Sequence, residues 1–287
     1  MSGLVCHQDG TCNGLQHMAA ITGDRATAIS VNCVASTHMD KPQDIYGLVG
    51  DEALNFVEND IALALMQKYG RDMAKDPVMV TGYGATARTI ISNTAKYLTA
   101  KKEHANTAEI IATGYLQAID TVAGAVTQLT ESIKICVNDA LLENPNKTKF
   151  TWCTADGFIA STEYRDEEEF RVRAGTLAAR MRGLGKAELD TVKTAGAMSP
   201  NLIHSIDSTH CRMVVRACEH ELVTVHDSIG SHPATYFDTA RTIREKFVLV
   251  HSYDALGDLC KGMNQVAPEF DGDYKAAEAL QSTYIFS

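Results

Sequence analysis

Apolar residues recur at helical spacing along most of the chain. Ala, Ile and Leu repeat every three to four residues in the longest such run, 106–142, which ends before Asn144-Pro145-Asn146. One apolar stripe per turn is typical of a helix that packs on a core, and proline cannot continue a helix. The same pattern predicts helices over 15–22, 44–69, 78–96, 106–142, 201–218, 235–250 and 255–266.

Short alternating runs predict strands at three places. One strand ends at Gln8. The turn dipeptide Asp156-Gly157 joins two runs over 149–164, and His226-Asp227-Ser228 interrupts the run 222–230, so each is expected to form a hairpin. The expected fold class is therefore α+β and mostly helical. Between these elements we expect a loop over 32–42, an acidic solvated surface over 166–169 and a flexible segment over 193–200.

The composition suits a folded protein of this kind. The chain has 287 residues, 45% of them hydrophobic, enough to bury a substantial core as one large domain or two lobes. Its eight cysteines include no Cys-x-x-Cys pair, which favours reduced thiols over a disulfide framework or zinc site. Without a secretion signal or a run of about 18 apolar residues, we expect a soluble cytoplasmic protein and no membrane partner. The net charge of −10 argues against a freestanding nucleic-acid-binding surface.

Two isolated aspartates carry the strongest chemical signal. Asp9 follows the first predicted strand and precedes the turn Gly10-Thr-Cys-Asn-Gly14, and Asp227 lies in the last predicted hairpin. Aspartates far apart in sequence, each just past or between strands, form a usual arrangement for a pair of hard metal ions. Such ions, about 4 Å apart, stabilise the attacking and leaving oxygens of phosphoryl transfer. The sequence therefore predicts a two-metal phosphoryl-transfer site.

Two basic residues and a tyrosine lie between these aspartates in the sequence. Arg71-x-x-x-Lys75 is followed by Tyr83-Gly84. On one helix these positions share a broad face, where two cations suit a triphosphate and the tyrosine suits a sugar or base. Asp76-Pro77 leaves two alternatives open, because either the regular helix begins there or the helix is kinked. Taken alone, Arg-x-x-x-Lys is typical of a solvated helix face.

A predicted helix before the second aspartate carries His204, Asp207 and His210 at successive i, i+3 positions. A metal site is conceivable there, but hydrogen bonds to substrate or to neighbouring backbone are the favoured interpretation. The chain contains no Walker motif, GxGxxG, GxSxG or HExxH. This absence argues against the common nucleotide cradles.

Three segments together resemble a known family, the single-subunit DNA-dependent RNA polymerases of bacteriophages, mitochondria and chloroplasts. Asp9-Gly-Thr-Cys-Asn-Gly-Leu-Gln-His17 is similar to motif A, Arg71…Lys75…Tyr83-Gly84 to motif B, and His226-Asp227-Ser228 to motif C. Their order and spacing fit, and the combination is highly specific. The resemblance spans the whole chain, since connecting segments match over 43–47, 152–158, 199–205 and 284–287.

The resemblance implies a right-hand polymerase fold. Palm segments would occupy 1–40, with motif A, and 201–287, with motif C and the carboxy-terminal helices. Helical fingers with motif B would occupy 41–200. The family's amino-terminal domain, thumb and first palm segment would be absent, so a second protein chain that supplies them is an expected partner. The other expected partners are a DNA template, the RNA product and nucleoside triphosphates.

The resemblance also implies a role for each site residue. Asp9 and Asp227 would bind two Mg²⁺ ions with the help of the Gly10 carbonyl, and His226 would support the metal-bearing hairpin. Arg71 and Lys75 would grip the incoming triphosphate, and Lys75 would also protonate the pyrophosphate leaving group. The remaining residues would contact sugar and nucleic acid: Tyr83 and His204 at the ribose 2′-hydroxyl, Gly84 at the template base and Tyr46 near the nucleic acid.

The motif B segment departs from the family pattern. Arg88-Thr89 stands where relatives often carry an aromatic residue and then a glycine, and Asp76 stands where phage relatives carry a second basic group. Both differences bear on template handling more than on chemistry.

Three functions stay open. The leading hypothesis is DNA-templated RNA synthesis by the catalytic carboxy-terminal part of such a polymerase, in a bacterial or phage-infected cytosol rather than an organelle. A family-A-like DNA polymerase fragment shares the Arg…Lys…Tyr-Gly pattern, but Ser228 and His204 favour RNA. The third hypothesis is a non-catalytic remnant that acts only as an interaction module.

Overall fold

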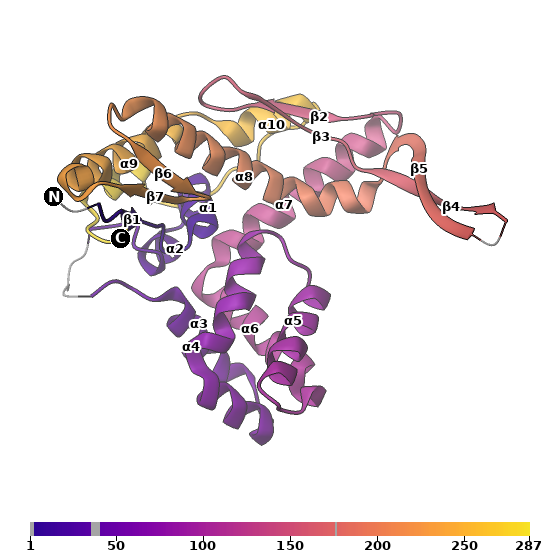
Figure 1. Cartoon of the computed structure of the whole chain (residues 1–287), viewed down its shortest axis with the longest axis horizontal. Helices are drawn as coiled ribbons and strands as arrows, with labels where there is room; N and C mark the ends of the chain where they lie inside the picture. Colours follow the sequence, from indigo (N-terminus) through magenta and orange to yellow (C-terminus); the bar gives the residue numbers. More distant parts are fainter. Residues whose placement is uncertain (1–2, 36–40, 176) are drawn as a thin grey trace.

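The computed structural model describes residues 3–35, 41–175 and 177–287 (Figure 1). Helices predominate within them and the sheets are small and antiparallel, which confirms the mostly helical α+β class. The helices are α1 (Asn13–Thr22), α2 (Arg25–Ser30), α3 (Ile45–Ala53), α4 (Asp60–Gly82), α5 (Ala87–Ala100), α6 (Ala108–Val122), α7 (Gly124–Glu143), α8 (Thr191–Ala217), α9 (Tyr236–Val250) and α10 (Ala255–Met263). The strands are β1 (Cys6–Gln8), β2 (Phe150–Cys153), β3 (Ile159–Thr162), β4 (Arg165–Ala174), β5 (Leu177–Leu189), β6 (Leu222–Val225) and β7 (Ser228–Ser231).

Residues from opposite ends of the chain build a three-stranded antiparallel sheet in the order β1-β7-β6. Gln8 of β1 lies opposite Ile229 of β7, and β6 and β7 form the hairpin predicted over 222–230. Just beyond β1, Gly10 forms an isolated bridge with Phe286. The two termini accordingly lie near each other beside this sheet (Figure 1). The two aspartate segments are thus brought together although they are more than 200 residues apart.

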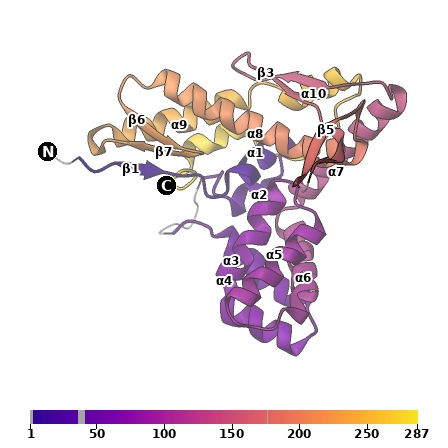
Figure 2. The same cartoon turned by 45° about the vertical axis from the view of Figure 1, so that its right-hand side comes forward.

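Helices α3 to α6 form a lobe that projects away from this sheet (Figures 1 and 2). Helix α4 is broken inside the lobe at Gly70, whose φ of 43° and ψ of −124° suit glycine and few other residues. The helix then continues through Pro77 to Gly82, so Arg71 and Lys75 lie on the same segment as Pro77. Neither alternative for Asp76-Pro77 is therefore confirmed, because the helix passes through both residues and its break lies at Gly70, before Arg71.

The run expected to form one helix over 106–142 forms two. Helices α6 and α7 meet at Ala123, which has non-helical dihedral angles, and their axes differ in direction by 95°. Gly124 weakens a continuous helix, and the burial of Ala123 in the core fixes the corner. Within residues 3–35, 41–175 and 177–287, no single helix is long and apolar enough to cross a membrane. Among the described residues, one bent pair of helices, Ala105–Val122 and Gly124–Glu143, passes that test when length and composition alone are considered.

Residues 193–200, expected to be flexible, belong to a helix, and residues 166–169, expected to be solvated surface, belong to a strand. Residues 166–169 lie in β4, which pairs with β5 in a long hairpin that projects from the body (Figure 1). Residues Phe170–Arg173 alternate as a strand does, but the acidic run before them is typical of solvated surface, so no strand was predicted there. Residues 193–200 belong to α8, where the Asp190 side chain caps the helix and Met198 is fully buried. Packing of α8 against α7 outweighs the breaking tendency of Gly196 and Pro200.

Candidate active site

Asp9 lies where the chain leaves β1. Its backbone is held in both directions, because the Asp9 N–H donates to the Ser287 carbonyl (3.3 Å) and the Ser287 N–H donates to the Asp9 carbonyl (3.1 Å). The backbone N–H of Gly10 also donates to the Asp9 carboxylate. The carboxy-terminal residues therefore fix the backbone that carries this acid.

Asp227 occupies the two-residue turn of the β6–β7 hairpin, between the paired residues Val225 and Ser228. The other turn residue, His226, has a φ of 56°, in the left-handed region that residues other than glycine enter at a cost. Since Ile229 lies opposite Gln8, this turn holds Asp227 at the end of the sheet where Asp9 follows β1. The predicted convergence of the two aspartate segments is present.

The two aspartates repel each other. Burial, followed by the charge of Asp227 and a hydrogen bond between the two side chains, raises the pKa of the Asp9 carboxyl. Two carboxylates held together without a cation are an electrostatic cost to the fold. A divalent cation between them would remove that cost.

A third acid, Asp207 on α8, joins this pair. Its side chain is 21% exposed, and Asn13 Nδ2 at the start of α1 donates to Asp207 Oδ1 at 2.5 Å. Burial and then the charge of Asp227 raise the pKa of Asp207 to about 6. We define the acidic cluster as Asp9, Asp207 and Asp227. The sequence placed Asp207 in a polar helix pattern but gave no signal that it would approach the two other acids.

Tyr83 and His204 lie beside the acidic cluster and stack on each other. Their ring centroids are 4.6 Å apart and the planes differ by 3°. Burial raises the pKa of the Tyr83 hydroxyl, and the charges of Asp207 and Asp227 raise it further. The following Gly84 has a φ of 73°, and a Cβ there would lie 2.8 Å from the Pro200 ring, so this approach of α4 to α8 needs glycine.

The two basic residues expected at a triphosphate are engaged elsewhere. Arg71 Nε donates to Asp44 Oδ2 at 2.5 Å, and the Arg71 guanidinium lies 5.1 Å from the centre of the Tyr46 ring. Tyr46 in turn donates to the Thr11 carbonyl (3.4 Å), two residues after Asp9. Both Arg71 and Lys75 are exposed to solvent. In the described part of the chain, neither forms an ion pair with the acidic cluster.

The three polar residues spaced along α8 point to different partners. His204 stacks on Tyr83, Asp207 accepts from Asn13, and His210 Nε2 lies 2.8 Å from the buried Ile243 carbonyl. The favoured interpretation, hydrogen bonding to neighbouring groups, is confirmed for His210. They do not converge on one metal site.

The acidic cluster offers few side-chain ligands for a metal. Among the residues that the structure describes, no group of three or more His, Cys, Asp or Glu side chains is arranged to hold a metal ion. Mg²⁺ usually takes only one or two carboxylates and completes its octahedron with water and substrate phosphates. The mutually repelling pair Asp9 and Asp227 fits that donor set.

Two acids thus converge at the end of a small antiparallel sheet, beside a stacked tyrosine and histidine. The comparison with known families gives the assignment. The chain belongs to the DNA-dependent RNA polymerase family, whose sequence model matches residues 1–284. This is the single-subunit, phage-type family that the three motifs indicated, so the DNA polymerase alternative is not carried further.

The curated relatives are plant and fungal RNA polymerases. The chain is 28% identical to "DNA-directed RNA polymerase 3B, chloroplastic" of Nicotiana tabacum and 27% identical to "DNA-directed RNA polymerase 1B, mitochondrial" of the same plant. Each alignment covers 100% of this chain but only 32% and 31% of the relative, so the chain spans about a third of their length. A third relative, "DNA-directed RNA polymerase 2A" of Nicotiana tabacum, is 27% identical and is covered over 93% of its length.

These relatives correct the expected location. Several are named as chloroplastic or mitochondrial, among them "DNA-directed RNA polymerase, mitochondrial" of Schizosaccharomyces pombe. They point to an organelle, so the expectation of a bacterial or phage-infected cytosol is wrong. The lack of a secretion signal and of a membrane-length apolar run carried the cytoplasmic expectation, and neither separates a cytosol from an organelle matrix.

Proposed function

We propose that this chain is the catalytic carboxy-terminal part of a single-subunit RNA polymerase and performs DNA-templated RNA synthesis. The observation that carries the proposal is the convergence of Asp9 and Asp227, from opposite ends of the chain, beside the stacked pair Tyr83 and His204. Family membership supports the same reaction class.

Asp9 and Asp227 would hold two Mg²⁺ ions, with the Gly10 carbonyl as a further oxygen ligand. When bound, the ions supply charge neutralisation for the triphosphate and the reacting oxygens. Burial and then the charge of Asp227 raise the pKa of Asp9, and the same concentration of negative charge attracts cations to the pair. His226, in its strained turn, holds Asp227 at the rim of the sheet.

The nucleotide would lie against Tyr83 and His204, which face the ribose. The flat stack leaves the Tyr83 hydroxyl near the acidic cluster as a neutral donor, because its pKa is raised. Arg71 and Lys75 would bind the triphosphate, and Lys75 would give a proton to the pyrophosphate. Gly84 would lie at the template base.

Arg71 has a specific barrier to that role. Its guanidinium is shared between Asp44 and the Tyr46 ring, so contact with a triphosphate requires it to give up an exposed ion pair. Such a pair is worth at most about 1 kcal/mol, and a triphosphate offers more charge. Tyr46 would then remain beside the nucleic acid.

The β4–β5 hairpin supports a nucleic-acid contact despite the acidic net charge. Arg171 lies directly opposite Arg180, and the alternation of the strand places Arg173 and Glu169 on the same face. All four are exposed, so arginines outnumber the acid among the described side chains of this face. Like charges opposite each other destabilise a hairpin, and a phosphate backbone would relieve that repulsion. This cationic face is the proposed contact to template or product.

The proposed subdivision follows the family. The segments 1–40 and 201–287 would form the palm around the β1-β7-β6 sheet, and 41–200 would form the fingers. The relatives that are about three times as long carry further sequence beyond the part that this chain matches, and the thumb and amino-terminal domain would be supplied by sequence of that kind.

Extension of an RNA primer on a DNA template strand, with a separately made amino-terminal part of a long relative as the partner, tests the proposal. Wild type should add ribonucleotides in preference to deoxyribonucleotides and require Mg²⁺, and Asp227→Asn should lower the rate of addition by about 10²- to 10³-fold. Asp238→Asn, an exposed aspartate on α9, is the matched control and should behave as wild type. No extension with the partner present would favour the remnant hypothesis, and equal activity in Asp227→Asn would contradict the assigned site.

A further inference from the structure

Three histidines lie together behind the acidic cluster, and the proposed reaction assigns none of them. This histidine cluster consists of His17 on α1, His210 on α8 and His251 directly after α9. The His17 ring stacks on Phe247, with centroids 5.5 Å apart, and lies 5.1 Å from the His251 ring and 6.1 Å from the His210 ring. Loss of hydration lowers the pKa of all three, to about 4 for His210 and about 3 for His251, so each ring is neutral.

His17 connects His251 to the acidic cluster. His17 Nδ1 lies 2.9 Å from His251 Nε2, a hydrogen bond. The other ring nitrogen, His17 Nε2, is fully buried and has no hydrogen-bond partner among the described residues. It lies 4.0 Å from Asp207 Oδ1, the same oxygen that accepts from Asn13. That distance is one of electrostatic contact and exceeds a direct hydrogen bond.

The neutral rings allow two arrangements, because each carries one N–H. If His251 Nε2–H donates to His17 Nδ1, the proton of His17 is on Nε2 and faces the Asp207 carboxylate. If His17 Nδ1–H donates instead, the lone pair of His17 Nε2 faces that carboxylate and repels it. Asp207 Oδ1 is an acceptor, because Asn13 donates to it. It therefore selects the first arrangement, in which the acceptor side of His17 is filled by His251.

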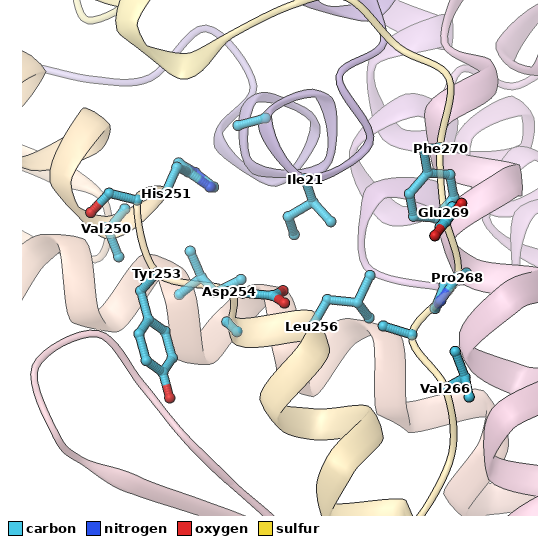
Figure 3. A pocket seen from close by; sticks show the side chains of 15 residues that line it. Ile21, Val250, His251, Tyr253, Asp254, Leu256, Val266, Pro268, Glu269 and Phe270 are labelled. Carbon is cyan, nitrogen blue, oxygen red and sulfur yellow. The ribbon is translucent and has the colours of Figure 1, made fainter.

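Of the three histidines in the cluster, His251 is the one that a small molecule can reach. It lines a pocket of about 490 Å³ between α1 and the segments around α10, together with Ile21, Tyr253 and Leu256. Figure 3 shows His251 at the edge of this pocket and Ile21 facing into it. Neither His17 nor His210 lines the pocket.

We propose that His251 is a positioning residue for the acidic cluster: it fixes His17 as the Nε2–H tautomer, and His17 holds the Asp207 carboxylate oriented toward Asn13. The series His251–His17–Asp207 thus fixes the position of the third acid of the cluster. The functional part of this inference rests on the proposed RNA synthesis, whereas the tautomer does not.

Tautomer and activity are measured on the full chain with ¹⁵N-labelled histidine rings. The wild type should show His17 protonated at Nε2, and His251→Ala should lose this state. His251→Gln places an amide N–H near the position of the imidazole Nε2–H and should keep it. A wild-type His17 protonated at Nδ1 would overturn the proposal whatever the activity of the protein.

Primer extension supplies the second readout. His251→Ala should lower kcat about tenfold with little change in the KM for nucleotide, as is usual when an outer partner of a metal-site group is removed. Millimolar imidazole should enter the pocket and restore kcat. The matched control is His210→Ala, which should not respond to imidazole because its site has no opening to the pocket.

A folded His251→Ala with undiminished kcat, or with a loss that neither imidazole nor the Gln variant corrects, would contradict the proposal. Complete inactivity of the wild type would count against the proposed function alone, because the NMR result does not depend on activity.

Discussion

Acidic side chains at two places in this protein have opposite electrostatic surroundings. Asp156, in the β2–β3 turn, has a side chain only 4% exposed and receives Arg212 Nε at 2.7 Å and Arg212 Nη2 at 2.8 Å. Arg216 adds a third cationic contact at 3.4 Å. The hydrogen bonds from Arg212, followed by one from Thr154, hold the pKa of Asp156 well below its usual range. In the acidic cluster, by contrast, carboxyl groups face one another and the pKa of Asp9 and of Asp207 is raised.

The difference separates a structural charge from a functional one. Asp156 joins the β2–β3 hairpin to α8, and the bidentate arginine offsets the cost of removing the carboxylate from water. The acidic cluster costs the fold free energy that it does not recover from its own partners. A fold keeps such a cluster where binding of a cation or substrate supplies the missing charge.

The largest expected effect is on catalysis. Asp227→Asn should lower templated RNA synthesis by about 10²- to 10³-fold, because the charge that it removes acts on the reacting groups. Its stability toward urea should not fall, since the substitution relieves repulsion with Asp9. Primer extension and urea unfolding on the same preparation measure both. A variant that loses activity only because it unfolds would remove the contrast with Asp156.

The complementary variant, at the acid that is paired with arginine, is Asp156→Ala. It leaves Arg212 without its partner and should destabilise the protein by about 3 kcal/mol, at the lower end for a buried pair because Arg212 is one-third exposed. The loss appears as a lower urea midpoint. Activity per folded molecule should remain that of wild type, and a specific fall in kcat would place Asp156 in the active site instead.

Acid dependence sharpens the comparison further. The folded-state pKa of Asp207 is about 6, above the ordinary value of 3.8, so its stabilising contribution is complete below about pH 4 and is lost as the pH rises through 6. Asp207→Asn should remove this slope and be more stable than wild type at pH 7.5 by up to about 3 kcal/mol. Urea unfolding from pH 4 to 7.5 measures this, with Asp238→Asn as the control. An unchanged slope would place the pKa of Asp207 near its ordinary value.

The smallest expected effect concerns the exposed ion pair. Asp44→Asn frees Arg71 from a contact whose two side chains are about half exposed. The KM for nucleotide should fall about twofold, which corresponds to a few tenths of a kcal/mol. Steady-state primer extension over a range of nucleotide concentrations measures it. A raised KM would mean that Asp44 orients Arg71 for the triphosphate and does not compete for it.

The sequence predicted those features that local patterns determine. Alternation and turn residues located the hairpins around Asp156 and Asp227, and helical spacing located most helices. The sheet pairing that joins Gln8 to Ile229 follows from tertiary packing, which no local pattern reports. The sequence paired Asp9 with Asp227 through the chemistry that two isolated aspartates suit, and the resemblance to a family indicated the same pair.

The remaining features depend on contacts between distant segments. Asp207 meets Asn13 across 194 positions, and no spacing rule reports such a contact. The corner at Ala123 and the continuity of α8 through Pro200 are decided by burial, which outweighs local propensity. The strand β4 was missed because its acidic start is typical of solvated surface.

The most direct test of the account is cation binding at the acidic cluster. Mn²⁺, a paramagnetic substitute for Mg²⁺, can be titrated by EPR into wild type, Asp227→Asn and Asp156→Asn, with and without a nucleoside triphosphate. The account predicts binding in wild type that strengthens with nucleotide, loss of that binding in Asp227→Asn and its retention in folded Asp156→Asn. Equal Mn²⁺ binding by wild type and Asp227→Asn would contradict it.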